Sequence, residues 1–215
     1  MQQTKGRKGI GVKADDLLDR LSQKAREEVS KRNPELSDTE VRRTGDIIAT
    51  AAVRYFMVKF SRGKVIAFDI DEALSFEGES GPYLQYAAVR ANNIFAKLKD
   101  RESVDAAAVI AALEATAPAS LADGSEDADE LWALAFEAAR LDEVVDQAVR
   151  TLELSVLAKY AFALAQQFNG FYHRFSILNE ERKDVRTWRA AVVEYYRRQI
   201  TTALSLMGCE IPDRM

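Results

Sequence analysis

The chain has 215 residues and a net charge of −4, with 47% hydrophobic and 30% charged residues, which is ordinary for a soluble globular protein. One large domain or two small ones can bury a core at this length. Cys209 is the single cysteine, so an internal disulfide framework and a cysteine-based zinc site are excluded. No apolar run approaches the roughly 20 residues that span a bilayer, and the basic N-terminus has no signal-like apolar region. We therefore expect a cytoplasmic protein without a membrane partner.

The charges are segregated along the chain. Residues 1–100 carry 18 Lys/Arg against 15 Asp/Glu, residues 101–158 carry 3 against 13, and residues 159–215 carry 9 against 6. Two readings fit this pattern. The basic segments could pack side by side and bind an anionic partner, especially through the six Lys/Arg between Arg182 and Arg198, or the acidic segment could simply be a solvated surface.

The first half of the chain predicts helices separated by clear stop signals. A stripe with period four predicts a helix over 14–31, which Asn33 and Pro34 end. Ser37 and Glu40 form a capping-box pattern at the start of a second helix that runs to about residue 60. Residues 64–70 are β-branched and aromatic, and we expect a short extended segment there.

A helix over 82–99 has an unusual second face. Its apolar stripe predicts a core contact, while Tyr83, Tyr86, Arg90, Asn93 and Lys97 fall on the opposite side at about 100° per residue. Two tyrosines away from the stripe fit stacking on unpaired bases with a cation nearby. They also fit a second packing face against a neighbouring helix.

The second half of the chain also predicts helices. Residues 114–130 are typical of a surface connection, and a helical hairpin follows over 131–150. An apolar seam over 157–175 and a periodic pattern over 180–207 predict two long helices, the last ending at Gly208. The pattern as a whole predicts an all-α helical bundle.

Catalytic and metal-binding patterns are missing from the sequence. The sole histidine, His173, has no cysteine partner, and we expect it at the surface. The carboxylates show no metal-ligand spacing, so no metal site is predicted. The loop around Gly6 and Gly11 has no preceding strand and lacks the Gly-Lys-Ser/Thr ending of a P-loop.

Several motifs, in their order and spacing, resemble the C-terminal part of class I arginyl-tRNA synthetases. They are GIGVKADDLLD at 9–19, AVRYFMVK at 52–59, IAFD at 66–69, FEGESGPYLQYA at 76–87, AQQFN at 165–169 and PDRM at 212–215. The Gly-Pro-Tyr-x-Gln-Tyr block and the closing Arg-Met are the most specific of them. The resemblance covers essentially the whole chain.

The resemblance implies a function in tRNA(Arg) binding. Residues 1–65 would hold the end of the catalytic signature loop and stem-contact helices, and residues 66–215 an anticodon-binding (DALR-type) bundle. The loop at 77–82 would lie against the tRNA. Expected partners are tRNA(Arg) and a catalytic domain in cis or in trans, and a monomer is expected. The residues implied around the anticodon are Tyr83, Tyr86, Arg90, Asn169, Tyr172 and Met215.

Departures from the family pattern concern catalysis and one polar contact. Of the signature loop only Gly6, Arg7, Lys8 and Gly9 match, and Gln3, Thr4 and Lys5 replace the expected residues. The family often has a histidine where Ala88 stands. No adenylation domain is present, so no cofactor is expected for this chain, and ATP and arginine are implied only for a full-length enzyme. The alternatives are a free-standing relative, a split-enzyme subunit that binds a catalytic chain rather than tRNA alone, or a helical scaffold without RNA binding.

Overall fold

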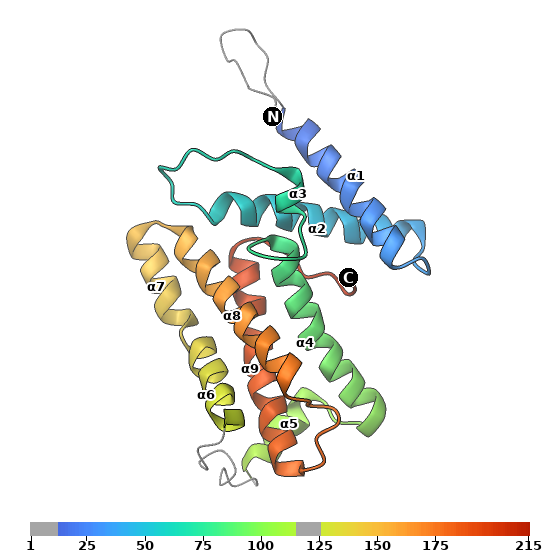
Figure 1. Ribbon diagram of the computed structural model, residues 1–215, viewed down its shortest axis with the longest axis vertical. Helices are drawn as coiled ribbons and strands as arrows, with labels where there is room; N and C mark the ends of the chain where they lie inside the picture. Colours follow the sequence, from blue (N-terminus) through green and yellow to red (C-terminus); the bar gives the residue numbers. More distant parts are fainter. Residues whose placement is uncertain (1–12, 115–125) are drawn as a thin grey trace.

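The computed structural model describes residues 13–114 and 126–215 of the chain. These residues form a bundle of long helices with a crossing pair of helices at one end (Figure 1). The all-α prediction is confirmed, because the described part contains helices and no strand.

The crossing pair consists of α1 (Ala14–Arg32) and α2 (Asp38–Val58), and its ends follow the sequence signals. The helix α1 buries Leu21, Ala25 and Val29, which lie four residues apart on one face. The predicted capping box is present: the Ser37 side chain accepts a hydrogen bond from the Glu40 N–H, and the Glu40 carboxylate accepts one from the Ser37 N–H. This reciprocal pair satisfies two backbone donors that the first turn of α2 leaves unpaired.

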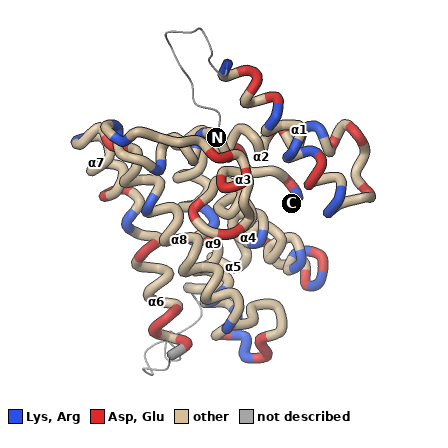
Figure 2. The backbone as a smooth tube through the Cα atoms, turned by 45° about the horizontal axis from the view of Figure 1, so that its top comes forward, with Lys and Arg blue, Asp and Glu red and all other residues tan. Residues whose placement is uncertain are grey.

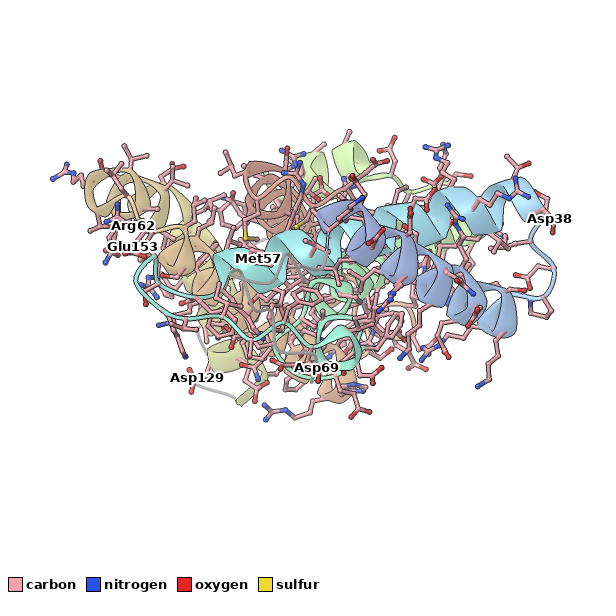
Figure 3. The ribbon with its side chains drawn as sticks, turned by 90° about the horizontal axis from the view of Figure 1, so that it is seen from above. Asp38, Met57, Arg62, Asp69, Asp129 and Glu153 are labelled. Atoms are coloured by element: carbon pink, nitrogen blue, oxygen red, sulfur yellow. The ribbon has the colours of Figure 1, made fainter. Side chains whose placement is uncertain are left out.

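The connection from α2 to α4 (Gly81–Glu102) holds the short helix α3 (Ile70–Ala73). Residues 65–69 have no regular secondary structure, so the predicted segment over 64–70 crosses the molecule without pairing in a sheet. Arg62 anchors its beginning through an ion pair of 3.2 Å with Glu153, and the two residues stand next to each other in Figure 3.

The close approach of α4 to α2 depends on a glycine. A Cβ atom on Gly81 would stand 2.5 Å from the backbone oxygen of Ala51, closer than real Cβ contacts. Ser80 caps α4, because its side chain accepts a hydrogen bond from the N–H of Tyr83, and Pro82 occupies the first turn, where its missing donor costs nothing.

The remaining helices complete the bundle, in which α9 contacts α4, α5, α6 and α8. The main core cluster joins residues of α2, α4, α8 and α9, with Phe168 and Tyr196 stacked at 4.1 Å between ring centroids near its middle. The sequence pattern predicts no helix in the region of α5, and α6 begins earlier than the predicted residue 131. The five helices are α5 (Ala106–Glu114), α6 (Glu126–Ala139), α7 (Leu141–Thr151), α8 (Leu154–Arg174) and α9 (Lys183–Leu206).

The helix α2 belongs to both halves of the molecule. Ile48 and Ala49 pack with α1, whereas Ala51 and Tyr55 belong to the core of the bundle. The Tyr55 hydroxyl donates a hydrogen bond of 3.1 Å to the carbonyl oxygen of Ala158 in α8. The two halves thus share a helix, and the division near residue 65 stays a prediction.

The acidic segment is not simply turned towards water. Figure 2 shows Asp and Glu along α6, and two carboxylates of the acidic segment bind basic residues of α9. Asp127 pairs with Arg189 at 2.6 Å, and Glu102 pairs with Arg186 at 2.8 Å. Part of the acidic segment therefore pairs with the C-terminal basic segment.

Candidate nucleic-acid interface

A polar pocket of about 200 Å³ lies where α4, the C-terminal end of α8 and the last residue of the chain meet. The helix α4 contributes Tyr86, Arg90 and Lys97 on one face, because three, four and seven residues return to the same side of a helix. Tyr172 and Met215 close the pocket from other parts of the chain. The structure thus brings together residues that are up to 129 positions apart in the sequence, from Tyr86 to Met215.

Arg90 stands between two tyrosine rings. Its guanidinium carbon lies 4.7 Å from the ring centroid of Tyr86 and 4.8 Å from that of Tyr172, within the range of cation–π attraction. Each tyrosine keeps 37% of its surface exposed. The arrangement presents two aromatic rings and one cation to solvent in a fixed order.

A hydrogen-bonded chain orients Arg90 from behind. Its Nη1 donates to the side-chain oxygen of Asn169 at 2.6 Å, and the Asn169 amide nitrogen donates to the Tyr83 hydroxyl at 2.9 Å. The two contacts fix which way the Asn169 amide points, because only its oxygen can accept from arginine. Asn169 therefore orients Arg90 directly, and Tyr83 does so through its hydrogen bond with Asn169.

Tyr83 does not stand on the solvent side of α4. Its ring is partly buried, packs against the main core cluster and lies 5.5 Å from the ring of Phe162. The helix α8 covers this side of α4 and leaves Tyr86 exposed one turn further on. The second reading, a packing face against a neighbouring helix, holds for Tyr83, and its place in a tRNA site stays a prediction.

The cations of the pocket lack carboxylate partners. Among the described residues, neither Arg90 nor Lys97 has an Asp or Glu oxygen within 4.0 Å. Their charge is therefore available to an anionic partner.

Several basic residues of the C-terminal segment, unlike Arg90 and Lys97, are paired with carboxylates. Arg189 is buried and binds Asp127 and Glu180. Arg197 and Arg198 both bind the carboxylate of Glu194. Burial raises the pKa of Glu194, but hydrogen bonds from both arginines outweigh it and hold the pKa below its ordinary value. Each of these three arginines is thus paired with a carboxylate of the same chain.

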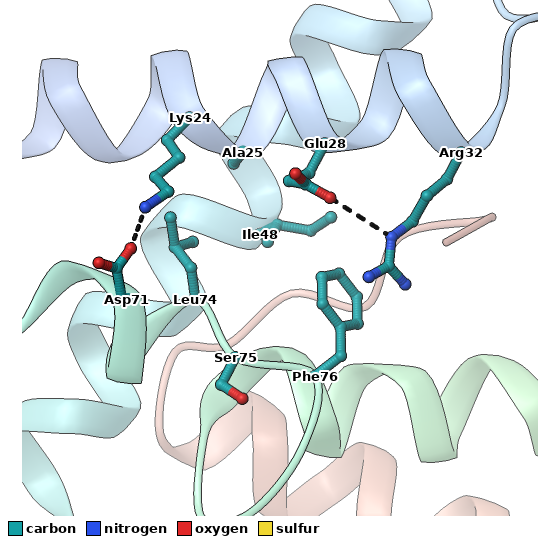
Figure 4. Close-up of a pocket in the computed structure, with 9 residues that line it drawn as sticks. All are labelled: Lys24, Ala25, Glu28, Arg32, Ile48, Asp71, Leu74, Ser75 and Phe76. Atoms are coloured by element: carbon teal, nitrogen blue, oxygen red, sulfur yellow. Dashed lines mark hydrogen bonds and ion pairs between the residues drawn. The ribbon is translucent and has the colours of Figure 1, made fainter.

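A second pocket, of about 220 Å³, lies between α1 and the segment after α3 (Figure 4). Its cations are neutralised: Lys24 pairs with Asp71, and Arg32 lies 3.6 Å from Glu28 and over the ring of Phe76. The loop that follows is held by the buried Lys59, whose ammonium donates to the Glu79 carbonyl oxygen at 3.0 Å. The contact of this loop with tRNA stays a prediction.

Other predicted positions have clear locations. His173 is exposed, as expected. Ala88 is buried in the core, so a polar side chain there would point away from the pocket. The signature residues Gly6, Arg7, Lys8 and Gly9 lie outside the described residues. Within the described part, no cluster of three potential ligands could hold a metal ion, and no helix is long and apolar enough to cross a membrane.

The sequence pattern does not predict the apolar lining of the pocket by Val89, Ile94 and Leu178, or the buried Gln85. Leu178 lines it from the connection before α9, and no local signal marks that position. Gln85 is completely buried behind it, although it stands in the most specific motif between the two tyrosines. The signal that could have found Gln85 is a polar side chain on the apolar, buried side of an amphipathic helix.

The fold and the pocket define an all-helical module in which a half-buried cation is held between two exposed aromatic rings. The family model of the DALR anticodon binding domain matches residues 84–215, and the chain belongs to this family. The predicted resemblance is confirmed.

Curated relatives and solved structures agree with this family. The chain is 35% identical to an arginine–tRNA ligase of Methanococcoides burtonii over 209 residues, covering 97% of this chain and 35% of the relative. It is 36% identical to that of Thermococcus sibiricus over 213 residues, covering 98% and 32%. The arginyl-tRNA synthetase of Thermus thermophilus superposes with a TM-score of 0.78 at 28% identity, covering 100% of this chain and 33% of that one. The chain thus spans about a third of the length of these proteins.

Proposed function

We propose that this chain recognises the anticodon loop of tRNA(Arg) as part of an arginine–tRNA ligase. The observation that carries the proposal is Arg90, held between the exposed rings of Tyr86 and Tyr172 without a carboxylate partner. The choice of tRNA(Arg) as the ligand rests on the family match over residues 84–215 and on the curated arginine–tRNA ligases.

The pocket suits unpaired nucleotides better than a duplex. Proteins read RNA sequence mostly in loops, where bases leave the helix and stack on aromatic rings or guanidinium planes. Tyr86, Tyr172 and Arg90 offer such planes, and Lys97 adds a cation for a neighbouring phosphate. Met215 lines the pocket as well, while it also packs against the cluster between α1 and α2. Asn93 can hydrogen-bond to the edge of a base.

Binding of tRNA(Arg) transcripts to Tyr86→Ala, Tyr172→Ala and Tyr195→Ala tests the proposal. Tyr195 is a matched control, because it is 38% exposed on α9 and does not line the pocket. Loss of one base–aromatic stack costs about 1–3 kcal/mol, so either pocket variant should bind roughly 5–150-fold more weakly. All three variants should melt close to wild type. Equal affinity of the three variants would contradict the proposal.

We further propose that ATP and arginine are bound by a separate catalytic part, in cis or in trans. The relatives are about three times as long as this chain. The chain alone should show no arginine-dependent ATP–pyrophosphate exchange. In this assignment α1 and α2 contact the tRNA stem, the protein is a cytoplasmic monomer and the signature residues at 6–9 belong to the catalytic part.

The alternative is a subunit that binds a catalytic chain and has no affinity for tRNA alone. A gel-shift titration with tRNA(Arg) and with an unrelated tRNA separates the two. Preferential binding of tRNA(Arg) by the isolated chain supports our proposal. Binding that appears only after addition of the catalytic part of an arginine–tRNA ligase supports the alternative.

A further inference from the structure

The last residues of the chain, Gly208–Met215, form a strap that runs from the end of α9 across α2 to the Arg90 pocket. Gly208 turns the chain out of α9 with a φ of +69°, a value that suits glycine. Cys209 is buried with its Sγ atom 3.8 Å from the backbone oxygen of Ala51. Pro212 is buried as well, and Met215 lines the pocket. The chain end lies between α2 and α4 in Figure 1.

Gln85 connects this strap to two helices. It belongs to α4, it is completely buried, and its Nε2 donates to the Glu210 carbonyl oxygen at 2.6 Å. The same nitrogen lies 3.4 Å from the Ile47 carbonyl oxygen of α2. Both partners are acceptors, so the amide nitrogen has to face them.

The other end of the Gln85 amide is unpaired within the part of the chain that the structure describes. Among the described residues, the Gln85 Oε1 atom is buried without a hydrogen-bond partner. A buried unpaired acceptor is destabilising, and an apolar side chain of similar size avoids this cost. What an apolar side chain cannot provide is a donor for Glu210 and Ile47.

We propose that Gln85 is a positioning residue for RNA recognition: it holds the strap against α2 and α4 so that Met215 stands beside Arg90. Gln85 touches no RNA itself, because it is completely buried. The inference rests on the proposed function, since it explains how the chain end reaches the anticodon pocket. It assigns the last residue of the chain a fixed place that depends on a side chain 125 positions before Glu210.

Labelling of the single cysteine tests the strap without RNA. Cys209 lies in the strap, and burial raises the pKa of its thiol to about 11, so wild type should react slowly with a thiol reagent at pH 7.5. Gln85→Met keeps the size of the side chain and removes the donor. We expect labelling to accelerate at least about tenfold at a temperature where circular dichroism shows a folded protein.

Val144→Ala is the control for labelling. It removes apolar volume from α7, where Val144 is buried away from the strap. It should lower the melting temperature and leave the Cys209 labelling rate near that of wild type. Unchanged labelling in Gln85→Met, or an equal acceleration in Val144→Ala, overturns the proposed role of Gln85. If Gln85→Met does not fold, Pro212→Gly loosens the strap without altering α4 and should show the same acceleration.

A double-mutant cycle tests the link to RNA. Gln85→Met and Met215→Ala should each weaken tRNA(Arg) binding by a similar factor, and the double variant should bind no more weakly than the weaker single variant. The factors by which Gln85→Met and Tyr172→Ala weaken tRNA(Arg) binding should instead multiply in the double variant. Faster Cys209 labelling with unchanged tRNA affinity overturns the positioning role. If Tyr172→Ala also binds tRNA(Arg) with normal affinity, the proposed function is wrong, and so is the role of Gln85 in RNA recognition. The labelling result then still decides whether Gln85 holds the strap.

Discussion

Tyr83 gives a direct test of how the helices pack, because its two possible roles predict opposite results. As a stacking platform it would contribute to RNA binding and little to stability. In the structure its ring packs against the main core cluster and Phe162, and its hydroxyl accepts a hydrogen bond from Asn169. Tyr83→Ala should therefore destabilise the protein, and Tyr83→Phe should do so less.

The magnitudes follow from burial and from the hydrogen bond. Truncation of a fully buried aromatic costs about 3–5 kcal/mol, and since Tyr83 is only partly buried we expect about 2–4 kcal/mol for Tyr83→Ala. At about 2–4 °C per kcal/mol for a protein of this size, the melting temperature should fall by roughly 5–15 °C. Tyr83→Phe keeps the ring and loses one net hydrogen bond, about 0.5–1.5 kcal/mol.

Urea unfolding and tRNA(Arg) titration of the same preparations measure both effects. Once folded, Tyr83→Phe should bind tRNA less than about tenfold more weakly, because Asn169 still receives the Arg90 hydrogen bond. The packing argument fails if Tyr83→Ala unfolds at the urea concentration of wild type and loses about 1–3 kcal/mol of tRNA affinity.

Three further predictions concern stability. Arg189→Met removes one partner of a buried ion-pair network with Asp127 and Glu180 and should cost about 3–5 kcal/mol in urea unfolding, whereas exposed Lys183→Met should stay within about 0.5 kcal/mol. Equal midpoints for the two variants would show that the network adds nothing. The pKa of Glu194 is lowered in the folded protein, so its ionised carboxylate adds to the free energy of unfolding. This contribution is fully present above the unfolded pKa of about 4.3 and is lost as the pH falls through the folded pKa. Glu194→Gln should flatten the loss of stability between neutral and acidic pH, and exposed Glu143→Gln should not; parallel pH profiles for wild type and Glu194→Gln would contradict this. Gly81→Ala places a Cβ 2.5 Å from the Ala51 oxygen and should cost about 1–3 kcal/mol, while Gly63→Ala meets nothing within 4 Å and should be close to neutral in the same assay.

Local signals in the sequence were sufficient for the long helices, but not for α3, α5 or the start of α6. The capping box at Ser37 and the stop at Gly208 each act within a few residues, and both are present in the structure. The α4 stripe correctly separated Tyr86, Arg90 and Lys97 from the core, because helical periodicity depends only on spacing.

Tertiary contacts decided what the spacing left open. Tyr83 and Tyr86 are only about 60° apart around α4, and the position of α8 alone determines that the first is covered and the second exposed. Likewise, the basic residues of α9 could face RNA or carboxylates, and Asp127 of α6 settles this for Arg189.

The candidate site itself depends on pairs that are remote in the sequence. Arg90 and Asn169 are 79 positions apart, and Gln85 and Glu210 are 125 apart. The sequence alone determined on which face of its helix a side chain lies, because the helical repeat is a local property of the backbone. Only the packed structure decided which of them meet, because a contact between distant segments depends on how whole helices fit together, which no short stretch of residues encodes.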